Sequence, residues 1–351
     1  MQFDEKELTS LLEQELLPNV KAIDKGKYPG RFLKQLGGYG YFKSKGKSPQ
    51  QRLQEEIEVV EQISSYCMTT GFLVWCQLAA ITYIRHTSNA PLQAELLSRL
   101  ENVEQLAGTG LSNPMKYYGG LEKLHLTAEK TEGGYLVSGA LPSVSNLGED
   151  HLFAIVALAE GKRRVMLMVN THFDGLSLKD KSDYLGINGS GTYACRFNRV
   201  FVPSRFLIAE DADQFIPYIR PYFLAYQIPL GLGVAQASIA AIQKAQSRQF
   251  GCNSYLRPNP EQLLSKINQV KSQLLTVTKH IPSNTAEIAA IRLKSVYTAL
   301  ETCQTEMLHV GGPAYLKWSN SSRRLREAYF MVNLTPTVRH LEKLLGNEGS
   351  I

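Results

Sequence analysis

The spacing of apolar residues changes twice along this chain of 351 residues, and this change constrains the fold most strongly. From Phe3 to about Leu106 apolar residues recur every three or four positions, which is typical of amphipathic helices. Between Gly108 and Arg205 they alternate with polar residues, which is typical of half-buried strands. From Pro229 onward the helical spacing returns. The sequence therefore predicts a β region inserted between two helical regions.

Two stretches of the middle region have the pattern of β-hairpins. "LHLTAEKTEGGYLVSGALPSVSN" alternates about the turn "TEGG", and "LFAIVALAEGKRRVMLMVN" alternates about "EGKR". Glycine at such turns supplies backbone conformations that other residues adopt with difficulty. A further alternating stretch, "TYACRFNRVFVP", predicts a strand that closes the region.

The apolar spacing in the C-terminal region predicts four long helices joined by short links, which is the arrangement of an antiparallel bundle. The second begins at Asn259, a plausible N-cap, followed by Pro260 at the first helical position. The last helix is expected over "SRRLREAYFMVNLTPTVRHLEKLL". Pro336 lies inside it, so we expect a kink and a lost backbone hydrogen bond there.

One apolar run, Cys67 to Ile84, has about the length of a membrane-spanning helix. It contains Thr69, Thr70, Gln77 and Thr82, and an acidic helical segment leads directly into it. Apolar residues make up 44% of the chain and charged residues 20%, as in soluble globular proteins. We therefore expect a helix buried on all sides inside the protein, and no membrane contact.

Charge, cysteines and motifs narrow the class further. The net charge is +6, but Lys and Arg are scattered, so we expect no nucleic-acid partner. Five cysteines without a CxxC pair are typical of reduced thiols, and the acidic N-terminal helix differs from a signal peptide, so we expect a cytoplasmic protein. The seven histidines are isolated from one another, which argues against a metal site. Common dinucleotide, phosphate-binding, zinc and serine-hydrolase motifs are missing from the sequence.

Five phrases stand in a characteristic order between about Leu106 and Leu345. They are "LAGTGLSNP", "LTAEKTEGGYLVSGALPSVSN", "LGINGSGTYACRFNRVFVPSRFLI", "SRQFG" and "LHVGGPAYLKWSNSSRRLREA". Each phrase alone is weak, but their order and spacing resemble those of the acyl-CoA dehydrogenase superfamily. The resemblance implies an α+β, mostly α fold. Its parts are a helical N-terminal domain (1–105), a middle β-barrel domain (106–208) and a C-terminal four-helix bundle (209–351).

The same resemblance implies flavin adenine dinucleotide (FAD), held between the β domain and the bundle. Its adenine end is shared across a subunit interface in the family, so we expect a homodimer or homotetramer. The implied cofactor-binding residues are Leu106, Gly108, Thr109, Ser143, Ser145, Arg248, Phe250, Gly311, Gly312 and Thr337. Thr109 would lie near the flavin pyrimidine ring, while Ser143 and Ser145 would replace the family's tryptophan and threonine. Arg248 with Phe250, and Gly311 with Gly312, would meet the partner's cofactor.

The residue that serves as base in the dehydrogenases is missing from its expected place. Counting from Gly311 places Thr335 there, and a threonine hydroxyl does not ionise near neutral pH. The base position of some relatives, on the first bundle helix, falls on Pro221. The neighbouring Arg220 keeps part of a substrate-binding phrase. Of the nearby carboxylates, we expect Glu327 to be a surface ion-pair partner and Glu342 to lie on a solvated helix face, and the catalytic residue stays unknown.

Three functions remain open at this point. The first is a flavin-dependent dehydrogenase that oxidises the CH–CH group of an acyl thioester. The second is a flavin-dependent monooxygenase or oxidase of the same fold, and the third is a non-catalytic flavin-binding or scaffold protein. An electron-transfer flavoprotein or a flavin reductase is the expected redox partner of the two enzymes. We choose the first function. The margin is narrow, because a shared scaffold does not establish a shared reaction.

Overall fold

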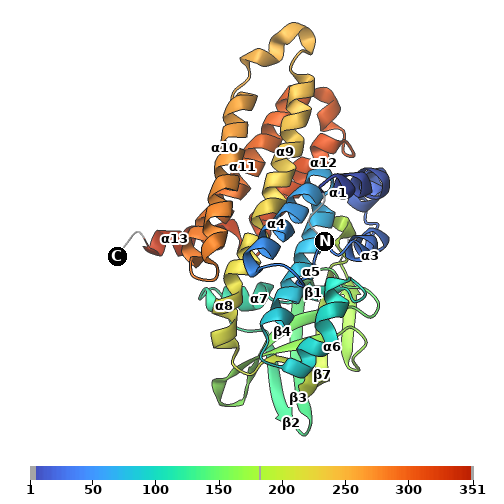
Figure 1. The fold of residues 1–351 in the computed structure, drawn as a ribbon, viewed down its shortest axis with the longest axis vertical. Helices are drawn as coiled ribbons and strands as arrows, with labels where there is room; N and C mark the ends of the chain where they lie inside the picture. Colours follow the sequence, from blue (N-terminus) through green and yellow to red (C-terminus); the bar gives the residue numbers. More distant parts are fainter. Residues whose placement is uncertain (1–4, 182, 349–351) are drawn as a thin grey trace.

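The computed structural model describes residues 5–181 and 183–348. A helical bundle forms one end of the molecule, a β-sheet forms the other, and shorter helices surround their junction (Figure 1). This order of helices, sheet and bundle confirms the predicted fold class. The physical basis is the change in apolar spacing. Apolar residues every three or four positions form one continuous face only on a helix, whereas alternating apolar residues do so only on a strand, and each element buries its apolar face.

Helices precede the sheet, as the N-terminal spacing predicts. They are α1 (Glu5–Leu11), α2 (Val20–Asp24), α3 (Gly30–Gly38), α4 (Pro49–Tyr66), α5 (Met68–His86) and α6 (Ala90–Glu101). The start of α4 is a capping box, in which Ser48 and Gln51 satisfy each other's backbone N–H groups.

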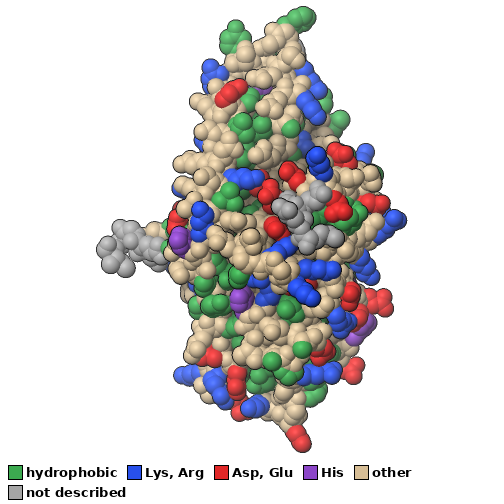
Figure 2. Space-filling model, in the orientation of Figure 1, with side chains coloured by type: hydrophobic (Ala, Val, Ile, Leu, Met, Phe, Trp, Pro, Cys, Tyr) green, Lys and Arg blue, Asp and Glu red, His purple; other side chains and the backbone are tan. Residues whose placement is uncertain are grey.

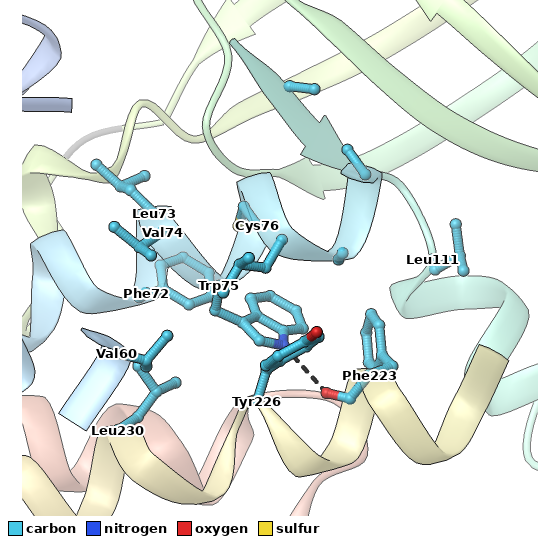
Figure 3. Packing of buried hydrophobic residues seen from close by; sticks show 14 of the residues in the cluster. Val60, Phe72, Leu73, Val74, Trp75, Cys76, Leu111, Phe223, Tyr226 and Leu230 are labelled. Carbon is cyan, nitrogen blue, oxygen red and sulfur yellow. Dashed lines mark hydrogen bonds between the residues drawn. The ribbon is translucent and has the colours of Figure 1, made fainter. Parts of the chain in front are cut away.

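The predicted buried helix is α5, and every residue from Met68 to Ile84 is buried. Figure 3 shows its Trp75 between Phe72 of the same helix and Phe223. The Trp75 indole N–H donates to the Phe223 carbonyl at 3.0 Å, which satisfies its polar atom inside the core. The thiol of Cys76, on the same helix, is also buried.

The middle region is an eight-stranded sheet with the short helix α7 (Ser112–Tyr118) beside it. Its strands are β1 (Ala107–Thr109), β2 (Leu126–Thr131), β3 (Gly134–Val144), β4 (Leu152–Ala159), β5 (Arg164–Asn170), β6 (Leu176–Asp180), β7 (Tyr193–Pro203) and β8 (Leu207–Ala209). The strand order is β6-β7-β3-β2-β4-β5-β8, and β1 pairs with β4. Both predicted hairpins form, with β2 antiparallel to β3 and β4 antiparallel to β5. The predicted closing strand is β7.

The bundle helices are α8 (Ala212–Ala225), α9 (Ile228–Ala245), α10 (Pro260–Val277), α11 (Thr285–Val310), α12 (Asn320–Asn333) and α13 (Val338–Glu348). The predicted cap of α10 is confirmed, because the Asn259 side chain accepts from the Gln262 N–H in a capping box. Helix α8 lies before the point at which the helical spacing returns in the sequence, and it contains Pro217 and Pro221. The Asp211 side chain caps its N-terminus.

The prediction of a single kinked last helix was wrong. Helix α12 ends at Asn333, α13 begins at Val338, and the intervening Thr335–Pro336 peptide is cis. Proline lacks an N–H and disfavours helical geometry in the residue before it, so the helix ends rather than bends. Thr335 and Thr337 consequently lie in a connection between two helices.

The surface carries both signs of charge. Lys and Arg side chains are interspersed with Asp and Glu on the face in Figure 2.

The segment Ala212–Ala245, which holds α8 and α9, is long and apolar enough by composition to cross a membrane, yet 83% of its most apolar window is buried inside the protein. Such burial is typical of a core helix pair.

Candidate functional site

A cavity with a volume of about 930 Å³ lies between the sheet and the bundle. This volume is at the upper end of the range of small-molecule and cofactor sites. Six serine and threonine side chains line it: Ser112, Ser143, Ser145, Thr192, Thr335 and Thr337. We call this space the first cavity.

On its sheet side, the hydroxyl groups are linked to one another. The hydroxyls of Ser145 and Thr192 lie 2.7 Å apart, and those of Ser190 and Thr192 lie 2.8 Å apart. Ser145 follows the end of β3, and Thr192 precedes β7. Since β3 and β7 pair along their lengths, the sheet itself places these two hydroxyls together.

On its helical side, the connection between α12 and α13 forms the wall. The Thr335 hydroxyl lies 2.8 Å from that of Ser112, at the start of α7. The Gln227 amide donates to the Thr335 carbonyl at 2.9 Å, and the fully buried Arg292 donates to the Gln227 side chain at 2.9 Å. Thr335 is therefore fixed through both its side chain and its carbonyl, and it is only 6% exposed.

The charged side chains that line the first cavity are mostly engaged. Arg326 donates to both carboxylate oxygens of Asp24, at 2.7 and 2.6 Å. Glu122 is the one carboxylate among the lining residues. It accepts from the Asn113 amide at 2.9 Å and lies 3.6 Å from the Lys116 ammonium. Arg326 and Glu122 therefore hold the walls together through paired charges.

Aromatic side chains close the first cavity toward the helical core. Phe330 lines it and packs edge to face against Phe72 at 4.9 Å. Phe72 stacks on Trp75 at 5.3 Å, and Trp75 meets Phe223 edge to face at 4.8 Å. This continuous aromatic packing, part of which is visible in Figure 3, leaves the space beyond Phe330 filled.

The residues predicted to bind the cofactor fall into three groups. Ser143, Ser145 and Thr337 line the first cavity, as does the base position Thr335. Leu106, Gly108 and Thr109 are packed beneath it instead. A Cβ atom on Gly108 would lie 2.2 Å from the Ser145 carbonyl oxygen, so this glycine allows the two segments to approach closely. The Thr109 hydroxyl lies 2.9 Å from that of the buried Tyr83.

The third group lies on the surface, away from the first cavity. Arg248 and Phe250 lie between α9 and α10, Gly311 and Gly312 follow α11, and the Phe250 side chain is fully exposed. The Asn253 amide donates to the carbonyls of Ala245 and His309 at 2.7 and 3.0 Å, which joins the two segments. The structure thus brings these four predicted residues to one surface.

The sequence reasoning missed several lining residues. Ser112 belongs to the quoted "LAGTGLSNP" phrase but was passed over in favour of Thr109, which lies in the same loop. Thr192 belongs to another quoted phrase. Tyr184 and His340 carried no recognisable signal, because only tertiary packing brings them to the first cavity.

The expectation that Glu327 is a surface residue was wrong. It is 1% exposed, and one of its oxygens accepts from the Thr69 N–H and hydroxyl at 3.2 and 3.3 Å. Its other oxygen accepts from Arg323 at 2.7 Å, so it is an ion-pair partner, but a buried one. Glu342 is exposed as expected and accepts from the Tyr297 hydroxyl at 2.7 Å. Neither residue lines the first cavity.

No family model matches the chain. Benzylmalonyl-CoA dehydrogenase of Aromatoleum aromaticum is 21% identical over 68% of this chain, and mitochondrial isovaleryl-CoA dehydrogenase of Oryza sativa subsp. japonica is 22% identical over 70%. These alignments cover 66% and 63% of the two relatives, less than two thirds of their length. A probable acyl-CoA dehydrogenase of Bacillus subtilis is 23% identical, with 91% of this chain and 90% of the relative covered.

Solved structures show the same fold. A glutaryl-coenzyme A dehydrogenase in complex with glutaryl-CoA has a TM-score of 0.87 at 18% identity, with 99% of this chain and 96% of that chain covered. Butyryl-CoA dehydrogenase of Megasphaera elsdenii also has a TM-score of 0.87, at 17% identity and complete coverage of both chains. A dibenzothiophene monooxygenase of Paenibacillus sp. A11-2 has a TM-score of 0.81 at 14% identity, with 97% of this chain and 95% of that chain covered. These similarities confirm the predicted resemblance to the acyl-CoA dehydrogenase superfamily.

Proposed function

We propose that the protein is an FAD-dependent oxidoreductase whose first cavity holds the flavin ring. The observation that carries this proposal is a hydroxyl-lined space of about 930 Å³ between sheet and bundle, in a chain with the acyl-CoA dehydrogenase fold. FAD, when bound, supplies a two-electron acceptor that neither hydroxyl nor amide side chains can provide. The protein's contribution is to bind, orient and enclose the reacting groups.

The chemistry of the lining residues fits such a ring. Hydroxyl and backbone N–H groups are the donors that flavin N5, O2 and O4 can accept from, and Ser112, Ser145 and Thr192 present hydroxyls to the space. Gly110 lines the same wall, and a Cβ atom there would lie 2.8 Å from the Ala154 carbonyl oxygen. The absence of a side chain therefore lets this segment of the wall pack closely against β4. Tyr184 and Tyr329 provide aromatic surface in place of the missing tryptophan.

The proposed substrate is an acyl thioester, oxidised at its CH–CH group. The acyl-CoA dehydrogenases at 21–25% identity support this choice. The aromatic packing behind Phe330 supports a short acyl group, because it leaves no room for a long chain in that direction. Thr335 and Ser112 are both neutral hydroxyls near pH 7. Their pair can orient a substrate or relay a proton, but neither can act as the base that removes a proton from the substrate.

The missing carboxylate at Thr335 also supports a second candidate, a flavin-dependent monooxygenase or oxidase. Such a reaction needs reduced flavin and oxygen, and it needs no base for an α-proton. The dibenzothiophene monooxygenase at a TM-score of 0.81 shows that this fold occurs in an oxygen-using enzyme. The third function, a flavin-free scaffold, predicts a colourless protein.

The exposed residues Arg248, Phe250, Gly311 and Gly312 support assembly with a second copy of the chain. A fully exposed Phe250 side chain is costly in water and is stabilised when a partner covers it. We therefore propose a homodimer or homotetramer in which these residues reach the partner's cofactor. An electron-transfer flavoprotein or a flavin reductase is the proposed redox partner.

The experiment combines flavin uptake with anaerobic substrate reduction. Purified protein is incubated with FAD and desalted, and bound flavin is measured by its visible absorbance. Short-chain acyl-CoA thioesters are then added without oxygen, and bleaching of the flavin is followed. We expect stoichiometric FAD and bleaching by thioesters with short acyl groups. Ser145→Ala should weaken FAD binding, whereas Ser10→Ala, at an exposed position of α1, should not.

The outcomes separate the three functions. A protein that takes up no flavin contradicts both enzyme proposals. Bound flavin that no thioester bleaches, but that oxygen rapidly reoxidises after chemical reduction, favours the monooxygenase or oxidase over the dehydrogenase.

A further inference from the structure

A smaller cavity lies directly behind the wall that carries Thr335. Its volume is about 220 Å³, and it is enclosed by α7, α8, the start of α11 and α13. Thr335 and Thr337 line the first cavity, whereas Pro336 between them lines this second cavity. His340 lines both. The two cavities are therefore separated by one loop and one imidazole.

Most of the lining of the second cavity is apolar. It consists of Met115, Leu224, Ala286, Ala289, Pro336, Leu344 and Leu345. Thr285, Arg220 and His340 complete it, and no carboxylate is among these described lining residues. A space that combines an apolar lining with a few convergent polar groups has the composition of a ligand site.

Arg220 brings a cation without a counter-charge into the second cavity. It is partly buried, and within the described part of the chain its guanidinium has no ion pair. The nearby Asp213 is occupied, because it accepts from Arg164 and from the Tyr118 hydroxyl. Burial lowers the pKa of Arg220 from its usual value, which reflects the unfavourable desolvation of its charge. A bound anion would relieve this cost.

His340 provides a second unsatisfied polar group. It is 4% exposed, and its Nδ1 has no hydrogen-bond partner among the described residues. Gly119 makes room for the ring, since a Cβ atom there would lie 2.2 Å from His340 Nε2. Burial lowers the pKa of His340, and the positive charges of Arg220, Lys343 and Lys116 lower it further. The imidazole is therefore neutral near pH 7 and can donate or accept a hydrogen bond.

The N-terminus of α11 adds to the positive potential. Thr285 and Ala286 of its first turn line the second cavity, and the Asn284 side chain does not cap the helix. The first N–H groups of a helix lack partners inside it and carry part of the positive end of its dipole. Glu287, in the same turn, accepts from the Asn284 amide at 3.3 Å and does not line the cavity.

We infer that the second cavity binds a carboxylate on a short apolar stem, held by Arg220, His340 and the start of α11. This ligand site is separate from the proposed flavin site, because the segment 335–337 and the His340 ring lie between the two cavities.

A carboxylate matches the second cavity better than a phosphate does. One guanidinium can donate to both oxygens of a carboxylate, which carries a single negative charge, and this bidentate geometry is favourable. A phosphate group carries about −1.5 to −2 charges at neutral pH, and a neutral His340 would leave part of that charge uncompensated. The apolar lining would in addition contact the stem of a carboxylate ligand, whereas inorganic phosphate has no such stem.

Thermal denaturation tests this inference without requiring flavin. The probes are butyrate, its neutral amide butyramide, and inorganic phosphate, each titrated against the full-length protein. We expect butyrate to raise the melting temperature, with little effect of the other two. Arg220→Gln should weaken butyrate binding by about ten- to a hundred-fold, the range of a charge-assisted hydrogen bond. Arg196→Gln, at an exposed position on β7, is the matched control and should bind normally.

Dependence on pH provides an independent measure. A bound anion raises the pKa of His340, so butyrate should bind more tightly as the pH falls below neutral, and His340→Gln should remove this dependence. If Arg220→Gln does not fold, Arg220→Lys keeps the charge and should retain weakened binding.

Two results overturn the inference: equal stabilisation by butyrate, butyramide and phosphate, or unchanged butyrate binding in both Arg220 variants. Since flavin bleaching is not involved, failure of this site is distinguishable from failure of the proposed oxidoreductase.

Discussion

Replacing Glu327 by glutamine tests whether this buried carboxylate is structural rather than catalytic. Glu327 on α12 accepts from the Thr69 N–H in the first turn of α5, where the N-cap residue Cys67 supplies no side-chain hydrogen bond. It also pairs with Arg323 at 2.7 Å, and both side chains are buried. Glu327→Gln keeps the shape of the side chain but leaves the Arg323 charge without its counter-charge.

The expected cost follows from this geometry. Removing one partner of a buried ion pair typically lowers the free energy of unfolding by about 3–5 kcal/mol, and glutamine should fall at the lower end because it can still accept one hydrogen bond. With a urea m-value of about 3 kcal/mol/M, a loss of about 3 kcal/mol lowers the unfolding midpoint by about 1 M. Urea denaturation followed by circular dichroism measures this shift.

A matched control is available on the surface. Glu301 on α11 pairs with Lys266 at 2.6 Å, and these side chains are 37% and 49% exposed. Glu301→Gln should therefore cost less than about 1 kcal/mol. Flavin bleaching per folded molecule should be similar in both variants. Equal stability of the two variants, or a Glu327→Gln protein of normal stability that has lost bleaching, would refute the structural role.

Three further perturbations have clear expected outcomes. Thr335→Glu should raise the rate of thioester-dependent flavin bleaching by about 10² to 10⁴, because it restores a proton acceptor, and Thr335→Gln should not. Burial, with the charges of Arg52 and Arg85, lowers the pKa of His86 to about 4. The pKa of His86 in the folded protein lies below the unfolded value of 6.5, so the free energy of unfolding falls as the pH drops from 6.5 toward 4. The fall is roughly 1 kcal/mol after solvent screening. Melting curves of His86→Gln should show a smaller loss of stability over this pH range. A thiol reagent should modify Cys252 rapidly and the buried cysteines slowly, and Cys252→Ser should remove the fast phase.

Features that depend on local sequence were predicted well. Both hairpins follow from alternating residues about a glycine-containing turn, and the cap at Asn259 follows from its neighbour Pro260. The buried character of α5 follows from its uninterrupted apolar run. In each case residues close together in the sequence decide the outcome. Ser143 and Ser145, which line the first cavity, could be singled out because they belong to a recognisable phrase, and Thr337 because the resemblance implies its position.

Features that depend on tertiary packing were not predictable in the same way. The burial of Glu327 requires the start of α5, which is 258 residues away along the chain. Ser112 was overlooked because a loop sequence does not reveal which of two hydroxyls points toward a cavity. The second cavity unites Arg220, Thr285 and His340, three positions with no local pattern in common. Resemblance to a family predicts the positions of the residues that the family shares. It does not predict the role of residues at which this chain differs from the family.

The contacts of α5 have a mechanical consequence for access to the first cavity. The Gln77 side chain accepts from the Ala107 N–H at the start of the sheet, Trp75 donates to Phe223 of α8, and Thr69 donates to Glu327 of α12. One rigid helix thus fastens the sheet and the bundle together from the inside. A hinge motion between them would break buried hydrogen bonds and aromatic contacts at the same time. Ligand entry and product release should therefore depend on the surface connections around residues 184–187 and 333–337, which border the first cavity, and not on movement of whole domains.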